Sequence, residues 1–308
     1  MISILIPTYN YNILNLVLEL INQCNYCTVR YEIIVIDDAS NNNQILLENN
    51  KLKDIPTVQY INLEQNIGRS AIRNRLAKIA KYETLLFLDA DTFPSNSNFI
   101  KNYIKELNKN NYMIIYGGIK YTNTPPDYNK RLRWLFGKKR EETDLKIRLK
   151  RPYKHTLTSN LMIKRALFNF ISFNETIREY GFEDLVFIKN CKDHGYKINH
   201  IENPVYHLGI DNSILFIKKH HSSLKNLKFL IEQKIISYED TSISKLYLQL
   251  SYLKLDYLLY NLHLLYHKIL IKILISKKPS LHIFDLYRLG YFCKLFYSNT
   301  DQDVNNLD

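Results

Sequence analysis

The stretch 85-LLFLDADTFP-94 decides how the first half of the chain is organised, because its apolar residues lead directly into two carboxylates. In a strand, side chains at positions i and i+2 point to the same side, so we expect Asp89 and Asp91 to project together. Close carboxylates repel each other unless a positive group lies between them. A divalent cation bound together with a phosphate would meet this need. The alternative is an acidic loop in solvent.

Short apolar runs alternate with helical patterns through the first 120 residues. We expect strands near residues 3–6, 32–36, 58–63, 84–88 and 112–116. We expect helices near residues 13–21 and 68–81, with an Asn-rich helix after the second strand. This alternation predicts an α/β fold with a mostly parallel central sheet and helices on both faces.

Polar residues follow three of the expected strands at the point where each strand ends. Asp37 and Asp38 follow the second strand, Asp89 and Asp91 follow the fourth, and 7-PTYN-10 closes the first. Ligands of such sheets bind beyond the carboxyl ends of the strands. The three strand ends therefore predict a binding site at one edge of the sheet.

The net charge of +12 and the four cysteines limit the classes of partner and compartment. A basic chain suits a partner that carries phosphates, but the charge does not choose among nucleic acid, an anionic membrane and a charged substrate. We expect ordinary thiols, including Cys24 and Cys27, and a reducing cytoplasm. The start of the chain does not have the pattern of a signal peptide, and we expect no membrane span.

The segment 130–151 holds ten basic residues against three acidic ones, and it contains the sole tryptophan, Trp134. A basic segment with an aromatic face is typical of a surface that lies on an anionic membrane or holds a phosphorylated acceptor. The alternative, which we favour slightly, is a solvated helix whose Trp134 packs on the sheet.

From about residue 211 the pattern is helical throughout. We therefore expect an α/β domain over residues 1–210, which would carry the binding site, and a helical region over residues 211–308, which would face a substrate or a membrane. The Tyr and Leu stripe of the last helix, 281–296, is expected to form core. The scattered Lys, Tyr and His side chains keep a membrane-surface role open. We expect the tail, 299–308, to be disordered.

Two later motifs add polar groups. In 180-YGFEDL-185 two acids follow a glycine at the expected start of a helix, where acids are favoured by the helix dipole. A helix cap would explain them equally well. In 203-NPVYHLG-209 a histidine ends a strand; such a histidine is usually structural, but beside an acidic metal site it is a candidate ligand.

In this order, the motifs resemble the family 2 glycosyltransferases, which have the GT-A fold. The resemblance covers residues 1 to about 210. The segments that carry it are 4-ILIPTYN-10, 35-VIDDAS-40, 66-NIGRSAIRN-74, 87-FLDAD-91, 158-TSN-160 and 181-GFED-184. No single segment is specific, whereas the ordered set with this spacing is.

The resemblance implies roles for individual residues. It implies a nucleotide-binding set that consists of Pro7, Tyr9, Asp37, Asp38, Arg69, Arg73, Asn74, Asp89 and Gly118. In that set Asp38 would contact the base, and Gly118 would let the chain pass close to the donor sugar. Asp91 would bind Mn²⁺ or Mg²⁺, with Asp89 and His207 as further ligands. Asp184 would act as the catalytic base, with Glu183 beside it.

We therefore expect an inverting, metal-dependent glycosyltransferase that uses a nucleotide-diphosphate sugar, and we favour a UDP-sugar. It would be a hexosyl- or N-acetylhexosaminyltransferase acting on a saccharide or lipid-linked acceptor in surface glycan synthesis, in the cytoplasm or at the inner face of the membrane. One alternative is a nucleotidyltransferase acting on sugar phosphates, although 7-PTYNYN-12 lacks the expected Gly-rich basic loop. The other is a non-enzymatic nucleic-acid-binding protein, against which the acidic strand ends argue.

Overall fold

A computed structural model describes residues 1–109 and 112–297 of the chain. These residues form two compact units. The first, the sheet unit, comprises residues 1–123, 137–178 and 183–209. The second, the helical unit, comprises 124–136, 179–182 and the residues from 210 onward. The expected division at residue 210 assigned 124–136 and 179–182 to the first domain, and the predicted disordered tail lies outside the described residues.

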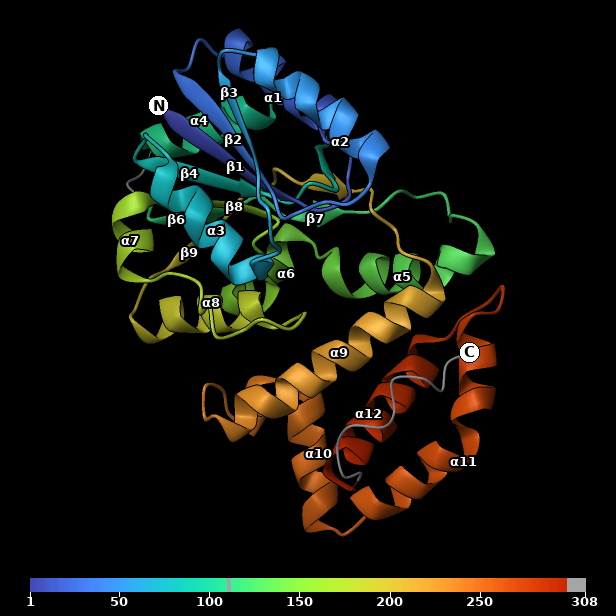
Figure 1. Cartoon of the computed structure of the whole chain (residues 1–308). Helices are drawn as coiled ribbons and strands as arrows, with labels where there is room; N and C mark the ends of the chain where they lie inside the picture. The colour runs from blue at the N-terminus through green and yellow to red at the C-terminus, as the bar shows by residue number, and fades with distance from the viewer. Residues whose placement is uncertain (110–111, 298–308) are drawn as a thin grey trace. The chain divides into compact units, whose positions relative to one another are not determined.

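The sheet unit is built around a seven-stranded sheet (Figure 1). Its strands, in spatial order, are β3 (Val58–Asn62), β2 (Tyr31–Asp37), β1 (Ile2–Thr8), β4 (Thr84–Leu88), β8 (Asn160–Lys164), β6 (Ile114–Tyr116) and β9 (Ile198–His200). Among these strands β8 runs antiparallel to both of its neighbours, β4 and β6. The other pairs are parallel, so the mostly parallel sheet predicted from the sequence is confirmed.

A second, three-stranded sheet lies in the same unit. It has the order β5 (Thr92–Pro94), β10 (Val205–His207) and β7 (Ile119–Lys120). β10 pairs antiparallel with β5, and His207 stands opposite Thr92. This small sheet brings the residues around 207 to the end of β4, more than 110 positions earlier in the chain.

Alternate residues of the central strands face two separate helical layers. On one face, Leu5, Ile34 and Phe87 pack with helices α3 (Gly68–Ile79), α7 (Arg165–Phe170) and α8 (Glu183–Asp193). The intervening strand residues, such as Ile4 and Leu86, are equally buried. Helices α1 (Leu14–Tyr26) and α4 (Phe99–Lys109) pack together and belong to the other layer. Burial on both faces explains why these strands are continuous apolar runs.

The chain also contains several short elements, of which η2 and α5 belong to the helical unit and the others to the sheet unit. They are α2 (Asn43–Asn50), η1 (Lys51–Asp54), η2 (Tyr128–Lys130), α5 (Arg131–Phe136), η3 (Gly137–Glu141), α6 (Leu145–Lys150) and η4 (Pro152–His155). Elements η2 to α6 occupy the basic segment 130–151, which is therefore not one solvated helix. Arg148 is only 3% exposed, although arginine is seldom buried without partners.

The helical unit is formed mainly by four helices and a short turn. They are α9 (Ser213–Glu232), η5 (Tyr238–Asp240), α10 (Ser242–Tyr252), α11 (Asp256–Leu274) and α12 (Leu281–Tyr297). Within this unit α12 packs on α9 and α11, as Figure 1 shows. Phe284, Tyr287 and Phe292 of α12 are buried, which confirms the prediction that the last helix supplies core. Leu132 and Phe136 of α5 join the same unit's core.

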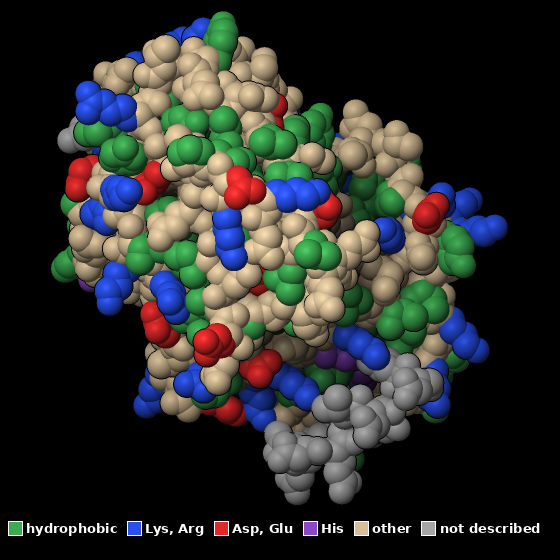
Figure 2. Space-filling model, turned by 45° about the horizontal axis from the view of Figure 1, so that its top comes forward, with side chains coloured by type: hydrophobic (Ala, Val, Ile, Leu, Met, Phe, Trp, Pro, Cys, Tyr) green, Lys and Arg blue, Asp and Glu red, His purple; other side chains and the backbone are tan. Residues whose placement is uncertain are grey.

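On the face of the molecule in Figure 2, Lys and Arg side chains are scattered among polar and hydrophobic ones. They do not gather into one continuous field on that face. A continuous basic face is what a nucleic-acid-binding protein would be expected to present. This view therefore adds no support to the nucleic-acid alternative.

Candidate active site

The end of β4 and the end of β10 are joined beside Asp91. The amide of Leu208 donates to the carbonyl oxygen of Asp91 at 2.8 Å. Because His207 stands opposite Thr92 in the small sheet, its ring lies next to Asp91. His207 Nε2 is 3.5 Å from Asp91 Oδ2. The structure thus brings together two of the three metal ligands predicted from the sequence.

Asp89 faces a different partner from Asp91. Its Oδ1 is 2.7 Å from Nη2 of Arg73, which projects from α3 and is 3% exposed. Burial alone would raise the pKa of Asp89, but Arg73 and Arg69 outweigh burial and lower it below its usual value. The structure therefore gives the two carboxylates of the Asp-Ala-Asp motif separate environments, one beside a buried guanidinium and the other beside an imidazole.

Glu183 and Asp184 occupy the first turn of α8, as the sequence predicted. Thr158 holds Asp184 through its hydroxyl, which donates to Oδ1 at 2.5 Å, and through its amide, which donates to Oδ2 at 3.2 Å. Burial raises the pKa of Asp184, the neighbouring Glu183 raises it further, and Arg73 and Thr158 oppose the rise. Glu183 pairs with Arg69 at 3.2 Å. A carboxylate with a raised pKa at a polar site is suited to general base catalysis.

Arg73 connects these two groups of acids electrostatically. Its guanidinium interacts with Asp89 first and then with Asp184 and Glu183, and together they raise its pKa despite the opposing effect of burial. Arg73 Nη1 also donates to the carbonyl of Arg69 at 3.3 Å. One buried cation thus lies among three carboxylates that come from β4 and α8.

Asp37 and Asp38 end β2 beside the end of β1. The amide of Asp38 donates to the carbonyl of Thr8 at 2.8 Å. Its carboxylate accepts from the amides of Ile67 and Gly68, at 2.7 and 3.1 Å. The Asp37 carboxylate accepts from the hydroxyl of Tyr60 at 3.0 Å. Both acids therefore order this edge of the sheet, and the predicted contact of Asp38 with a base stays a prediction.

The remaining residues of the predicted nucleotide site lie on three separate elements. Pro7 is part of β1, and Tyr9, just beyond it, is 52% exposed. Asn74, on α3, donates to the carbonyl of Phe173 at 2.9 Å and accepts from the amide of the same residue. Gly118 follows β6 with a φ of +98°, which favours glycine. A direct role for each in binding a nucleotide sugar stays a prediction.

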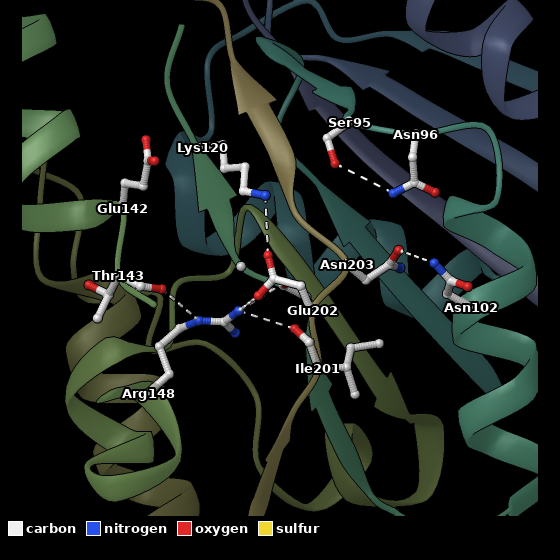
Figure 3. A network of polar contacts seen from close by, with 12 residues as sticks. Ser95, Asn96, Asn102, Lys120, Glu142, Thr143, Arg148, Ile201, Glu202 and Asn203 are labelled. Carbon is white, nitrogen blue, oxygen red and sulfur yellow. Dashed lines mark hydrogen bonds and ion pairs between the residues drawn. The ribbon is translucent and has the colours of Figure 1, made fainter. Parts of the chain in front are cut away.

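Arg148 lies beside Ile201 and Glu202 (Figure 3) and close to Gly118. Its guanidinium donates to the carbonyl of Ile201 at 3.1 Å and lies 3.4 Å from the carboxylate of Glu202. Glu202 also pairs with Lys120 at 3.2 Å. A Cβ atom at Gly118 would approach within 2.8 Å of the Arg148 guanidinium, so the glycine leaves room for this buried arginine. The sequence analysis placed Arg148 among surface cations, and its role at this loop was missed.

Further residues around Asp91 and Asp184 were not predicted as site residues. A side chain at Gly209 would overlap the carboxylate of Asp91, so the glycine leaves that carboxylate its space. The ring of Tyr121 stacks on that of His207, with centroids 5.4 Å apart. Thr158 was noted only as part of a motif. Its partner Asp184 is 26 positions away, and only the fold brings the two together.

A divalent cation fits part of this arrangement. A carboxylate and an imidazole, Asp91 and His207, form a donor set that Mn²⁺ accepts. Asp89 is bound to Arg73, and among residues 1–109 and 112–297 no group of three His, Cys, Asp or Glu side chains stands close enough to hold a metal ion. Asp91 and His207 would therefore supply two protein ligands, and Asp89 as a third stays a prediction.

Two solved structures with a similar fold contain nucleotides or nucleotide sugars. The crystal structure of TarS 1-349 from S. aureus in complex with UDP aligns with a TM-score of 0.52 and 18% identity, over 96% of this chain and 90% of that one. The mannosyltransferase PcManGT from Pyrobaculum calidifontis, in complex with GDP-Man and Mn²⁺, aligns with a TM-score of 0.52 and 16% identity, over 75% and 64%. These similarities show that the fold is GT-A.

Sequence comparison identifies the family. Chondroitin synthase from Pasteurella multocida (strain Pm70) is 32% identical over 128 residues, which are 40% of this chain and 13% of that protein. The chain thus spans only a small part of that relative. The sequence profile of glycosyl transferase family 2 matches residues 3–172, more than half of the chain. The protein therefore belongs to glycosyl transferase family 2.

Proposed function

We propose that this glycosyltransferase transfers a sugar from a UDP-sugar to an acceptor hydroxyl, with inversion at the anomeric carbon and with help from a divalent cation. The position of Asp184 carries the proposal. Its carboxylate is held by Thr158 in the first turn of α8, and Arg73 couples it to Asp89 at the end of β4. This coupling supports a site in which the proposed base and the proposed diphosphate-binding edge act together.

The chemistry needs a base of this kind. In a single displacement the acceptor oxygen bonds to the anomeric carbon as the bond to the diphosphate oxygen breaks, and UDP leaves. Asp184 takes the proton of the acceptor hydroxyl, and one direct displacement inverts the anomeric centre. The anomeric carbon becomes oxocarbenium-like, as in glycoside hydrolysis. Glu183 keeps Arg69 beside the base through their ion pair.

Asp91 and His207 would hold the cation, Mn²⁺ or Mg²⁺, together with oxygens of the diphosphate. A bound divalent ion stabilises the charge that builds on the leaving diphosphate. The proximity of the carboxylate and the imidazole supports this role. The Mn²⁺ in the structure of PcManGT also supports it.

UDP is the nucleotide that we favour. One similar structure, TarS 1-349, is a complex with UDP and another a complex with UDP-GlcNAc. The PcManGT complex contains GDP-Man, so the GT-A fold alone does not select the base. We propose that Pro7, Tyr9 and Asp38 line the base pocket, and that a hexose or an N-acetylhexosamine is transferred.

The acceptor that we propose is a saccharide or a lipid-linked saccharide in surface glycan synthesis. The name of the relative chondroitin synthase supports a glycan acceptor. A net charge of +12 supports peripheral contact with an anionic membrane, at its cytoplasmic face. Among the described helices, none has both the length and the apolar content needed to cross a bilayer.

UDP release tests the proposal without knowledge of the acceptor, because such enzymes slowly hydrolyse their donors. Purified protein is incubated with a panel of UDP-sugars, with Mn²⁺ and then with EDTA. We expect release of UDP from one sugar, and its loss in EDTA. Release of pyrophosphate from a nucleoside triphosphate and a sugar phosphate would instead indicate the nucleotidyltransferase. Absence of UDP release and of UDP binding across the panel would refute the donor assignment.

Asp91→Asn tests the metal site in the same assay. We expect it to abolish transfer and to weaken the Mn²⁺-dependent binding of UDP measured by calorimetry, because a neutral amide is a poor ligand for a hard cation. Asp54→Asn is the matched control, since Asp54 is an exposed acid in η1 of the same unit. Full activity of Asp91→Asn would contradict the role of Asp91.

A further inference from the structure

Helix α11 of the helical unit leaves most of its apolar surface uncovered. Of its 19 residues, all within the described part of the chain, the buried ones are Asp256, His263 and Leu274. One stripe of large apolar side chains is exposed: Leu258 (55%), Leu262 (44%), Leu265 (68%), Ile269 (54%) and Ile273 (36%). Steps of three and four residues place them along one side of the helix. We call these five residues the α11 stripe.

A contiguous row of exposed apolar side chains calls for a functional explanation. Single exposed leucines are normal, whereas contiguous apolar patches mark surfaces that contact another protein or a membrane. Two further large apolar side chains are exposed shortly before α11, Tyr252 (80%) at the end of α10 and Leu253 (67%). The α11 stripe is therefore a candidate docking surface.

The charges around the α11 stripe are almost all positive. Residues 251–278 contain five lysines and one acid, Asp256. All five lysines are exposed, whereas Asp256 is buried and accepts a hydrogen bond from Tyr297 at 2.6 Å. Lys268 and Lys272 each stand three residues after a member of the stripe, so they flank it on the same side of the helix.

A basic cavity lies just beyond the end of α11. Its volume is about 680 Å³, and it is lined by Pro125, Pro126, Asp127, Tyr128, Lys130, Arg131 and Lys277. Arg131 donates from Nη1 to the carbonyl of Lys277 at 2.7 Å, which fixes the cavity to the residues after α11. Three cations face one acid there. Lys277 lies three residues beyond Leu274, where α11 ends, so the cavity lies close in the chain to the last member of the stripe, Ile273.

We propose that the α11 stripe docks on an anionic lipid bilayer. The leucine and isoleucine side chains enter the boundary between headgroups and acyl chains, while Lys268, Lys272 and the basic cavity face lipid phosphates. A helix with an apolar side and flanking lysines lies in the interface in this way. The inference gives the proposed membrane contact a defined surface, and it does not depend on the sugar or on the catalytic residues.

Charge complementarity favours a bilayer over a second copy of the chain. Two copies joined through α11 would bring their lysine rows together, and the segment 251–278 offers no exposed acid to pair with them. The stripe is also short for a coiled coil, which needs apolar positions sustained over about three or four heptads. An anionic bilayer supplies both the apolar phase and the opposite charge.

Vesicle sedimentation of the full chain tests the proposal. The probes are vesicles of phosphatidylcholine alone and vesicles that also contain phosphatidylglycerol. We expect binding to the anionic vesicles that weakens as salt is added. The double variant Leu265→Glu, Ile269→Glu should lose this binding. Leu47→Glu is the matched control, because Leu47 is 69% exposed on α2 in the sheet unit, and it should bind as wild type does.

Lysine variants sharpen the test. Lys268→Gln and Lys272→Gln should each weaken binding to anionic vesicles about fivefold, which corresponds to about 1 kcal/mol per lysine. Unchanged binding of the Leu265→Glu, Ile269→Glu variant, or absence of binding by wild type, would overturn the proposal. A wild-type dimer in light scattering that this variant dissociates would also overturn it, in favour of a second copy. UDP release from a soluble donor should be normal in the variant, so failure of docking and failure of the proposed reaction are distinguishable.

Discussion

The two units of the molecule differ in which side chains they bury and which they expose. In the sheet unit, apolar strands are fully covered, and the buried Arg73 interacts with the half-buried carboxylates of Asp89 and Asp184. In the helical unit, neutral histidines are packed among tyrosines, and the leucines of α11 are exposed. Each unit thus contains a departure from ordinary burial. These departures, buried charge in one unit and exposed leucine in the other, are where we place function.

The largest expected effect tests the buried charge of the sheet unit. Asp184→Asn removes the proposed base, and general base catalysis contributes about 10²–10⁴-fold to rate. We expect sugar transfer to fall by that factor or below detection, while UDP binding measured by calorimetry stays near normal. Asp193→Asn is a matched control, because Asp193 ends the same helix and pairs with Lys189 at the surface. Full transfer by Asp184→Asn would remove Asp184 from the mechanism.

The second effect concerns Arg73, the buried arginine that interacts with Asp89 and Asp184. Arg73→Met leaves the Asp89 carboxylate, which is 27% exposed, without its main partner, and breaking a fully buried ion pair costs about 3–5 kcal/mol, which is the upper bound for this pair. We expect the urea midpoint of the sheet unit, followed by circular dichroism, to fall accordingly. Arg69→Met is the comparison on the same helix, since Arg69 is half exposed and its pair with Glu183 should contribute about 1 kcal/mol or less. Equal losses in the two variants would show that burial does not distinguish them.

Much of the sheet unit was predictable from the sequence because its signals are local. Strands such as 84–88 are apolar runs that end in polar residues, and the structure places β4 at Thr84–Leu88 as predicted. The carboxyl ends of parallel strands meet at one edge, so the proximity of the ends of β1 and β2 followed from the α/β pattern. The acids of α8 were predictable as a helix start.

What the sequence did not reveal depends on contacts between distant segments. Arg148 looks like its basic neighbours in the chain, and only the folded structure shows that it is buried close to Gly118. Asp89 and Asp91 are two positions apart and were predicted to act together, but Arg73 and His207 give them different partners. Helix α11 has apolar residues on several sides, so its periodicity predicted a helix without showing which side is exposed.

The third effect concerns two neutral histidines of the helical unit, His221 and His263. Burial lowers the pKa of His221 to about 3 and that of His263 to about 4. In the unfolded chain both would titrate near 6.5, so the unfolded state binds more protons below that pH. Stability of the helical unit is therefore complete above about pH 6.5 and is lost as the pH falls toward 4, by about 1.4 kcal/mol per pH unit for each histidine.

Fluorescence of Trp134 measures this effect, because the sole tryptophan belongs to the helical unit. We expect the urea midpoint reported by Trp134 to fall between pH 7 and pH 5. His221→Gln should reduce this dependence, since glutamine does not titrate. His194→Gln is the control, because His194 is an exposed histidine in the sheet unit. A midpoint that stays constant with pH would show that the two histidines are not held neutral.

The smallest effect concerns Asp184, a half-buried acid of the sheet unit, and the hydrogen bond that stabilises its charged form. The Thr158 hydroxyl donates to the carboxylate and lowers its pKa, against the larger effect of burial. Thr158→Val removes that donor, so the pKa of Asp184 should rise further. The acidic limb of the pH profile of kcat/KM should then move to higher pH by about one pH unit or less. One unit corresponds to about 1.4 kcal/mol of stabilisation of the charged carboxylate. Well above the limb the rate should change less.

Thr156→Val is the control for this shift. Thr156 is a buried threonine two positions away, and its hydroxyl donates to the carbonyl of Pro152 instead of to an acid. Loss of its hydrogen bond should lower stability without moving the acidic limb. If both variants moved the limb equally, or neither did, Asp184 would not be the group that the limb reports. A shift in Thr158→Val alone would show that the Thr158 hydroxyl stabilises the charged form of Asp184. In the helical unit, by contrast, burial favours the neutral form of His221 and His263.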